Sequence, residues 1–262
     1  MDLGLKNKIA IIAGSSEGMG RAAATAFAAA GANVALCART EKKLNAAAEE
    51  IRKSHKVEVF AQPVDVTEFA AVESFVAAVA KKFGRVDICV ANAGGPPPKN
   101  FLSISMEEWH KAVDLSFLSV VAFAKAVIPH MQKNRWGRFV TITSTSVRQP
   151  IPDLILSSAV RPAVVGLVKS LAIEFGKDGI TVNNVAPGYT ATERLKELAE
   201  VRALAAGITE QQIYDKWATE IPIRRLAKPE EIGDTIAWLA SDRAASITGQ
   251  TIMVDGGNYK GM

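Results

Sequence analysis

The sequence predicts a doubly wound α/β fold, in which helices cover both faces of a parallel seven-stranded sheet. Short apolar runs alternate along the chain with longer segments whose apolar residues recur at helical spacing. The short runs are apolar throughout, which is typical of strands buried on both faces of a parallel sheet. The expected strands lie near residues 8–13, 33–38, 57–61, 86–91, 137–143, 179–185 and 250–254.

Six helices are expected between these strands, with right-handed crossovers from each strand to its parallel neighbour. They lie near residues 18–30, 41–53, 68–82, 105–132, 156–176 and 229–240. Pro162 falls inside the fifth of them, where a proline removes a hydrogen bond and clashes with the preceding turn. We therefore expect this helix to start late, near Ser157–Arg161, or to kink there.

Residues 189–228 depart from the alternation of strand and helix. They contain two helix-like pieces between Pro187 and Pro222. An excursion of this length within a compact domain is usually functional, so we interpret it as a helical lid over a substrate site. A surface helical hairpin is the alternative. No linker or repeat interrupts the chain, so residues 1–262 are expected to form a single domain.

Composition excludes several classes of partner. The chain has 262 residues, of which 48% are hydrophobic, and a net charge of +4. Lys and Arg do not cluster in a run or along one helix face, so no nucleic-acid partner is expected. No uninterrupted apolar run reaches membrane-spanning length, and the first residues do not resemble a signal peptide.

The cysteines and histidines predict neither a disulfide nor a metal site. Cys37 and Cys89 lie in separate apolar runs, which favours buried free thiols and a reducing cytoplasmic location over a disulfide. His55, His110 and His130 have no partners at metal-ligand spacing, so no metal site is expected.

A glycine-rich stretch, AGSSEGMGRA, follows the first expected strand and opens the first helix. Gly14, Gly18 and Gly20 permit a tight turn whose backbone N–H groups approach a phosphate, and the helix N-terminus adds partial positive charge. Ser15 and Ser16 are candidates for hydroxyl contacts to the same phosphate. The context predicts Rossmann-type dinucleotide binding, with a plain tight turn as the alternative.

The end of the second strand favours NADP over NAD. A carboxylate usually binds the adenosine ribose of NAD here, but the sequence has Ala38 followed by Arg39. A guanidinium binds a 2′-phosphate through paired, charge-assisted hydrogen bonds. Glu41 lies close enough to keep NAD as the alternative.

These features together resemble the short-chain dehydrogenase/reductase family over essentially the whole chain. The segments PVDVT, VANAGG, VTITS, VNNVAPGYTAT and GQTIMVDGG match the family's motifs in order and spacing. Within the family, the likeness is greatest to ketoacyl-carrier-protein reductase-like members, which implies a homotetramer or homodimer. The resemblance also implies cofactor contacts for Met19, Asp65, Val66, Asn92, Ala93, Gly94, Pro187, Gly188, Thr190 and Thr192.

The resemblance fails at the positions that carry the family's proton transfer. Ser144 matches the catalytic serine, but Ser157 stands where the family has tyrosine and Arg161 where it has lysine. The flanking residues agree, since SSAVRPAV lies where the family shows YSASKAAV. Asp114 replaces an asparagine that orders a water relay. The catalytic candidates are therefore Ser144, Ser157, Arg161 and Asp114.

These replacements change the available chemistry. A serine hydroxyl is far less acidic than a tyrosine, and an arginine stays protonated and passes no proton. One hypothesis is an NADP-dependent carbonyl reductase or alcohol dehydrogenase with a serine or ordered water as proton donor. Tyr189 and Tyr214 are alternative donors, although packing within the lid is the better explanation for both. The second hypothesis is a nucleotide-binding protein that lacks reductase activity or catalyses a non-redox reaction on a small molecule.

Overall fold

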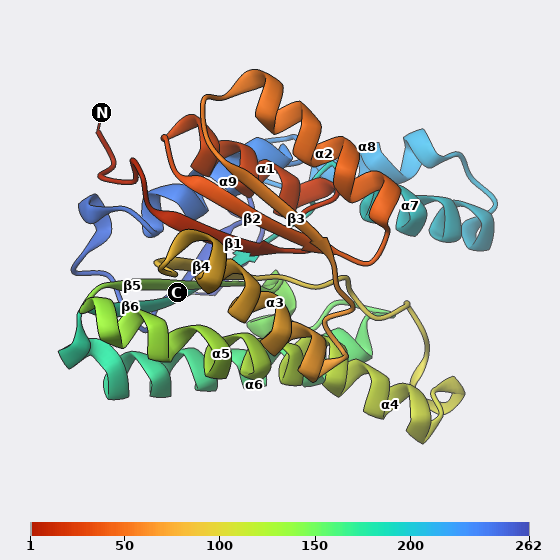
Figure 1. The fold of residues 1–262 in the computed structure, drawn as a ribbon. Coiled ribbons are helices and arrows are strands. Elements are labelled where there is room, and N and C mark those ends of the chain that lie inside the picture. The colour runs from red at the N-terminus through yellow and green to blue at the C-terminus, as the bar shows by residue number, and fades with distance from the viewer. Residues whose placement is uncertain (1, 262) are drawn as a thin grey trace.

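The computed structural model describes residues 2–261 and contains the expected parallel sheet. Seven strands pair in the order β3-β2-β1-β4-β5-β6-β7, every pair being parallel (Figure 1). The doubly wound α/β prediction is therefore confirmed. The strands are β1 (Ile9–Ala13), β2 (Asn33–Ala38), β3 (Val59–Pro63), β4 (Ile88–Ala91), β5 (Gly137–Ile142), β6 (Ile180–Pro187) and β7 (Thr251–Val254).

Helices cover both faces of the sheet and form two separate cores with it. On one face lie α1 (Gly18–Ala29), α2 (Glu41–Ser54) and α9 (Pro229–Leu239), and α1 packs along α9 (Figure 1). On the other face lie α3 (Phe69–Phe83), α5 (Ser119–Asn134) and α6 (Ile155–Phe175). The central strands β1, β4, β5 and β6 are buried along their whole length, which explains their uninterrupted apolar sequence.

The edge strand β3 begins two residues later than its apolar pattern predicts. Only Val59 of its five residues is buried, so sequence hydrophobicity marks its ends poorly. The long helix expected near 105–132 is also divided. It consists of α4 (Met106–Val113), a π-helical turn η2 (Asp114–Leu118) and α5. A π-helical turn inside a longer helix often accompanies a functional site.

Helix α6 corrects the prediction made from Pro162. The helix begins at Ile155, not near Ser157–Arg161, and it continues through the proline to Phe175. Its first turn is completed before the proline, because Ser158 N donates to the carbonyl of Leu154 at 2.9 Å. Buried Val160 and Val164 hold the segment in the core, and this packing offsets the hydrogen bond that Pro162 cannot donate.

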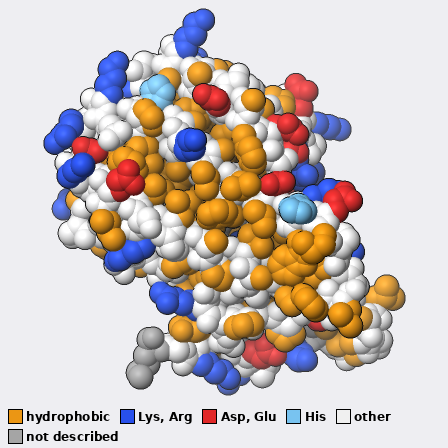
Figure 2. Space-filling model, turned by 90° about the horizontal axis from the view of Figure 1, so that it is seen from below, with side chains coloured by type: hydrophobic (Ala, Val, Ile, Leu, Met, Phe, Trp, Pro, Cys, Tyr) orange, Lys and Arg blue, Asp and Glu red, His pale blue; other side chains and the backbone are white. Residues whose placement is uncertain are grey.

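Two helical stretches, Met106–Asn134 and Ile155–Asp178, are long and apolar enough to cross a membrane by length and composition alone. Both belong to the core of the fold, because one side of each packs on the sheet. Figure 2 shows the opposite side of this layer, where hydrophobic side chains gather across a broad exposed face. Ile173 of α6 is 75% exposed.

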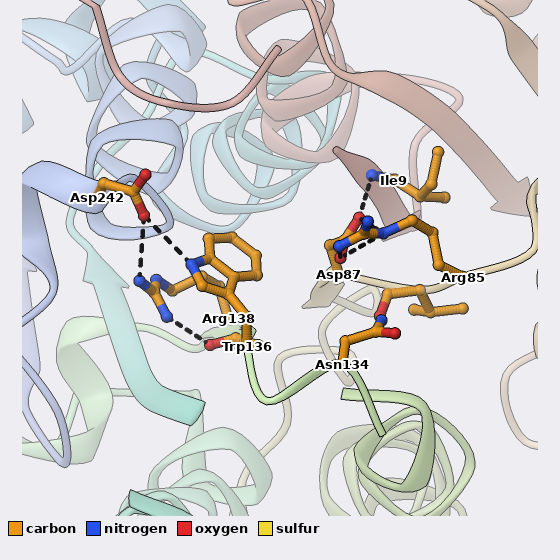
Figure 3. A network of polar contacts seen from close by, with 9 residues as sticks. Ile9, Arg85, Asp87, Asn134, Trp136, Arg138 and Asp242 are labelled. Carbon is orange, nitrogen blue, oxygen red and sulfur yellow. Dashed lines mark hydrogen bonds and ion pairs between the residues drawn. The ribbon is translucent and has the colours of Figure 1, made fainter. Parts of the chain in front are cut away.

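A polar network joins the amino ends of the strands (Figure 3). Asp87, which is fully buried, accepts a hydrogen bond from Ile9 N at 2.9 Å and is paired with Arg85 at 2.6 Å. Asp242 pairs with the buried Arg138 of β5 at 3.5 Å. These charges lie at the opposite end of the sheet from the carboxyl ends of the strands. The carboxyl ends of the strands lie outside this network.

Candidate active site

A cavity of about 360 Å³ opens where the strands of the sheet end. This is the position at which doubly wound sheets bind their ligands. Most residues proposed from the sequence line it. They are Gly14, Ser16, Gly18, Met19, Gly20, Arg39, Val66, Asn92, Ala93, Gly94, Ser144, Ser157, Arg161, Pro187, Gly188, Thr190 and Thr192.

The glycine turn forms one end of the cavity and tolerates no side chain at its tightest point. Gly14 has φ +61° and Gly18 has φ +58°, in the left-handed region that glycine favours. A Cβ at Gly20 would lie 2.2 Å from the carbonyl oxygen of Gly14. Asn92 braces the turn, donating from Nδ2 to Ala13 O at 3.2 Å. The backbone of this turn therefore lies open to a ligand.

Two predicted contact residues are not among those that line the cavity. Ser15 is fully buried, and its hydroxyl donates to the carbonyl of Cys37 at 3.3 Å, so it ties the turn to β2. Asp65 accepts hydrogen bonds from Thr67 N at 3.0 Å and Thr67 Oγ1 at 2.7 Å. The Ser15 hydroxyl therefore has a structural partner, whereas both bonds to Asp65 reach only Oδ1, so its expected contact with the cofactor stays a prediction.

Arg39 lines the cavity immediately after β2, beside Ala38. It is a surface-exposed cation, and no carboxylate in the described part of the chain forms an ion pair with it. Burial opposes ionisation of Asp65, but hydrogen bonds from Thr67 and the charge of Arg39 together lower the pKa of that carboxyl. Arg39 therefore interacts with the carboxylate of Asp65 only through its charge. Its guanidinium lines the cavity and forms no ion pair with the described residues.

Serine hydroxyls cluster at the end of β5. Ser144 caps a short helical turn, its Oγ accepting from Ser146 N at 3.2 Å. The hydroxyl of Ser146 lies 3.0 Å from that of Ser157, which is 6% exposed. Ser146 was not proposed from the sequence, although the run VTITSTS holds it two residues beyond Ser144. Ser146 thus joins the other two, to Ser144 through its backbone N–H and to Ser157 through its hydroxyl, and the three residues form a serine row beside the cavity.

Arg161 lies one helical turn beyond Ser157 and points into the same region. Its Nη1 donates to the carbonyl of Thr143, whereas its Nε is buried without a hydrogen-bond partner. Burial and the nearby charge of Arg194 lower the pKa of Arg161 to about 10. The guanidinium therefore stays protonated at neutral pH.

Asp114 does not line the cavity. It opens the π-helical turn η2, and the next residue, Leu115, faces the cavity instead. The sequence position alone could not reveal this, because a π-helical turn changes which side chains share a face with those before it. Asp114 therefore makes no direct contact with the cavity, and its expected part in ordering a water relay stays a prediction.

The two tyrosines proposed as alternative proton donors pack inside the segment after β6. Tyr189 stacks on Trp217 at 4.8 Å between ring centroids, and Tyr214 meets the same ring edge-on at 5.6 Å. Burial raises the pKa of both tyrosines, which makes them poorer acids. Neither lines the cavity, so the structure favours their role in packing.

The segment after β6 forms one wall of the cavity with helix α7 (Glu193–Ala206), which precedes α8 (Glu210–Glu220). Thr192 caps α7, its Oγ1 accepting from Leu195 N at 3.3 Å. Arg194 lines the cavity from the first turn of α7 and was missed from the sequence. It belongs to no sequence motif, and only the folded chain brings it to the loop after β4, where its Nη2 donates to Pro96 O at 2.9 Å.

No group of three or more His, Cys, Asp or Glu residues within 2–261 is arranged to hold a metal ion. Cys37 and Cys89 are free and buried. Burial raises the pKa of Cys37 to about 12, so this thiol is not a nucleophile at neutral pH.

The fold and the cavity define a dinucleotide-binding α/β protein. The family model described as Enoyl-(Acyl carrier protein) reductase matches residues 13–258. The chain is 35% identical to the 3-oxoacyl-acyl-carrier-protein reductase FabG of Escherichia coli, covering 98% of this chain and 99% of that protein. It is 36% identical to oxidoreductase UcpA of Salmonella typhimurium, covering 97% and 95%. The chain therefore belongs to the short-chain dehydrogenase/reductase family.

Solved structures agree with this assignment. L-Sorbose reductase from Gluconobacter frateurii, complexed with NADPH and L-sorbose, superposes with a TM-score of 0.96 at 32% identity, covering 100% of both chains. An actinorhodin polyketide ketoreductase with NADPH superposes with a TM-score of 0.93 at 30% identity, covering 97% of this chain and 98% of that one.

Proposed function

We propose that this protein is an NADP-dependent oxidoreductase that interconverts a carbonyl group and an alcohol on a small molecule. One observation carries the proposal: a single cavity holds both the glycine turn with Arg39 and the cluster of Ser144, Ser157 and Arg161. The two structural relatives above, which are NADPH complexes, support the same cofactor.

The residues at the glycine end fit this cofactor. The turn leaves room for a pyrophosphate against its backbone, since any Cβ at Gly20 would fill the space beside Gly14. Arg39 offers an unpaired guanidinium for the 2′-phosphate that distinguishes NADP from NAD. Ala38 supplies no carboxylate that would repel that phosphate.

NADPH, when bound, supplies a hydride, so the protein has to hold the carbonyl group and deliver a proton to its oxygen. Ser157 donates its hydroxyl proton in this proposal and recovers one through Ser146 or water. Ser144 hydrogen-bonds the substrate oxygen. Arg161 passes no proton, but its positive charge stabilises the negative charge that develops on that oxygen.

Replacing Arg39 tests the cofactor assignment. In Arg39→Asp, the carboxylate would repel the 2′-phosphate and accept a ribose hydroxyl, so we expect NADPH affinity to fall by roughly tenfold or more and NADH to be preferred. Fluorescence titration with each nucleotide measures the change. Lys42→Asp makes the same charge change on α2 outside the cavity, so it should preserve the NADPH preference. Unchanged preference in Arg39→Asp would sink the assignment.

A second function is a nucleotide-binding protein without reductase activity. The observation that favours it is that no tyrosine lines the cavity, because Tyr189 and Tyr214 both pack on Trp217. The serine row beside the cavity offers hydroxyls that are much weaker acids. The double substitution Ser157→Tyr with Arg161→Lys separates the two functions. Reductase activity that only the double variant possesses would favour this second function. A parent enzyme that is faster than the double variant would favour a working serine and arginine site.

Three further features complete the proposal. Residues 189–228 act as a substrate lid, supported by the wall that the start of α7 forms. The protein works in the cytoplasm, which two buried free thiols suit. It forms a homotetramer or homodimer through the apolar face of α5 and α6 (Figure 2), which light scattering after size-exclusion chromatography would measure.

A further inference from the structure

Two arginines from distant parts of the chain meet beside the catalytic serines. Arg161 comes from α6 and Arg194 from the first turn of α7, and both line the cavity. They approach the loop after β4 at one point. A Cβ built on Gly95 would lie 3.6 Å from Arg161 Nη2 and 4.0 Å from Arg194 Nε.

Neither guanidinium has its charge satisfied within the cavity. In residues 2–261, no carboxylate pairs with Arg161, whose Nε is buried without a partner. Arg194 Nη2 donates to Pro96 O at 2.9 Å, and its only ion pair is with the exposed Glu197 at 3.1 Å. The repulsion between the two cations contributes to the lowered pKa of Arg161. A buried cation normally has an anionic partner, and Arg161 has none among the described residues, whereas Arg194 is 46% exposed and its pairing with Glu197 is screened by solvent.

The carboxylates that line the cavity belong to its other end. These carboxylates are Glu17 and Glu193. Glu17 accepts a hydrogen bond from Lys43 at 2.7 Å, which is the main cause of the raised pKa of that lysine. The more distant charge of Glu193 raises the same pKa further. The phosphates of a dinucleotide already have the glycine turn and Arg39. The other ligand of the cavity is the substrate. We therefore expect the anion that binds Arg161 and Arg194 to be part of the substrate.

We propose that the substrate is an oxo acid whose carboxylate binds between Arg161 and Arg194, with its carbonyl group at Ser144 and Ser157. This inference rests on the proposed function and specifies its substrate class. The reaction is balanced by the groups already named. The carbonyl carbon gains the hydride, its oxygen gains one proton through Ser157, the carbon–oxygen double bond becomes single, and NADPH becomes NADP⁺. The product is a hydroxy acid.

The lid makes this recognition selective. Arg194 lies on α7, so an anionic substrate links the lid to α6 through two charge-assisted contacts. A neutral ester of the same shape accepts only weaker hydrogen bonds and leaves the buried charge of Arg161 without an anion. The site should therefore discriminate between a carboxylate and its ester more strongly than apolar contacts allow.

Calorimetric titration tests the inference without requiring turnover. Benzoylformate and acetoacetate, each compared with its methyl ester, are titrated into protein with saturating NADP⁺. We expect at least one acid to bind roughly 10- to 100-fold more tightly than its ester, as expected for a charge-assisted hydrogen bond. Arg194→Met should abolish this preference while leaving the affinity for NADP⁺ unchanged. Lys196→Met removes an exposed cation from the same helix and should retain the preference.

Three results would overturn the inference: equal affinity of acids and esters, failure of both acids to bind, or an equal loss in Lys196→Met. Failure of the proposed function looks different. If the acid preference depends on Arg194 but no oxo acid or neutral ketone oxidises NADPH in the presence of enzyme, the anion site stands and the reductase proposal falls.

Discussion

The hydroxyl of Ser157 is the side chain on which the proposed chemistry depends most directly. It is nearly buried and lies 3.0 Å from the hydroxyl of Ser146, so its proton has a defined route to a second hydroxyl. A serine is a weak acid in water, and it acts here only if the charge of Arg161 stabilises the oxyanion formed.

Removal of this hydroxyl should reduce the rate while leaving the cofactor bound. In Ser157→Ala we expect kcat to fall by roughly 10²-fold or more, because a positioned proton donor is lost. NADPH affinity should not change. Steady-state kinetics and nucleotide titration measure the two effects separately. Ser158→Ala, whose hydroxyl accepts only from Ile151 N at 3.4 Å, is the matched control. An unchanged kcat in Ser157→Ala would assign the proton to another donor.

Among the helices, α9 shows how side chains define an element's start. Pro229 occupies the first turn, where its missing N–H costs nothing. Glu231 accepts a hydrogen bond from Lys228 N at 2.7 Å. It also accepts from Nη1 and Nη2 of Arg225, at 2.8 and 2.6 Å. The hydrogen bond from Arg225, followed by that from Lys228, lowers the pKa of Glu231 to about 2.

This cap should make part of the protein's stability depend on pH. A carboxyl with a lowered folded-state pKa contributes stability above its unfolded value of 4.5 and loses it as pH falls toward about 2. Because Glu231 is 40% exposed, solvent screens the pair, and Glu231→Gln should cost only about 1 kcal/mol at neutral pH.

Denaturant unfolding of the parent and Glu231→Gln at several pH values checks this expectation. The difference in unfolding free energy should shrink between pH 4.5 and about 2. Glu230→Gln removes the neighbouring carboxylate of the same first turn and should show a smaller, nearly constant difference. A difference that is independent of pH would contradict the assigned cap.

At the scale of the whole molecule, stability and ligand binding use opposite ends of the sheet. The amino ends of β1 and β4 are joined through Asp87, and the carboxyl ends carry the cavity (Figure 3). Asp87 is fully buried and is held by Ile9 N and Arg85, so its charge has a dedicated partner.

Asp87→Asn should therefore destabilise the protein without altering its site. The substitution leaves Arg85 facing a neutral amide, and because Arg85 is 43% exposed, the loss should be about 1–3 kcal/mol. Chemical denaturation should show this loss, whereas NADPH titration at low temperature should give the parent affinity. Asp234→Asn, on the exposed side of α9, should change neither quantity. Weakened NADPH binding by folded Asp87→Asn would show that the two ends are coupled.

The sequence by itself determined the sheet, the glycine turn and the place of Arg39. These features depend on short-range patterns: apolar runs that only two-sided burial explains, glycines needed for positive φ, and a cation directly after a strand. The family's motifs added Ser144, Ser157 and Arg161 at their spacing.

Only the tertiary structure decided which of these side chains meet. Ser15 is buried with its hydroxyl bonded to Cys37 O, Asp65 accepts from Thr67, and Asp114 opens a π-helical turn, so none of the three lines the cavity. Arg194 reaches Arg161 from 33 positions further along the chain, because the start of α7 lies against the loop after β4, where Arg194 Nη2 donates to Pro96 O. Side-chain direction and contacts between distant segments arise only when the chain is packed, so no local pattern in the sequence encodes them.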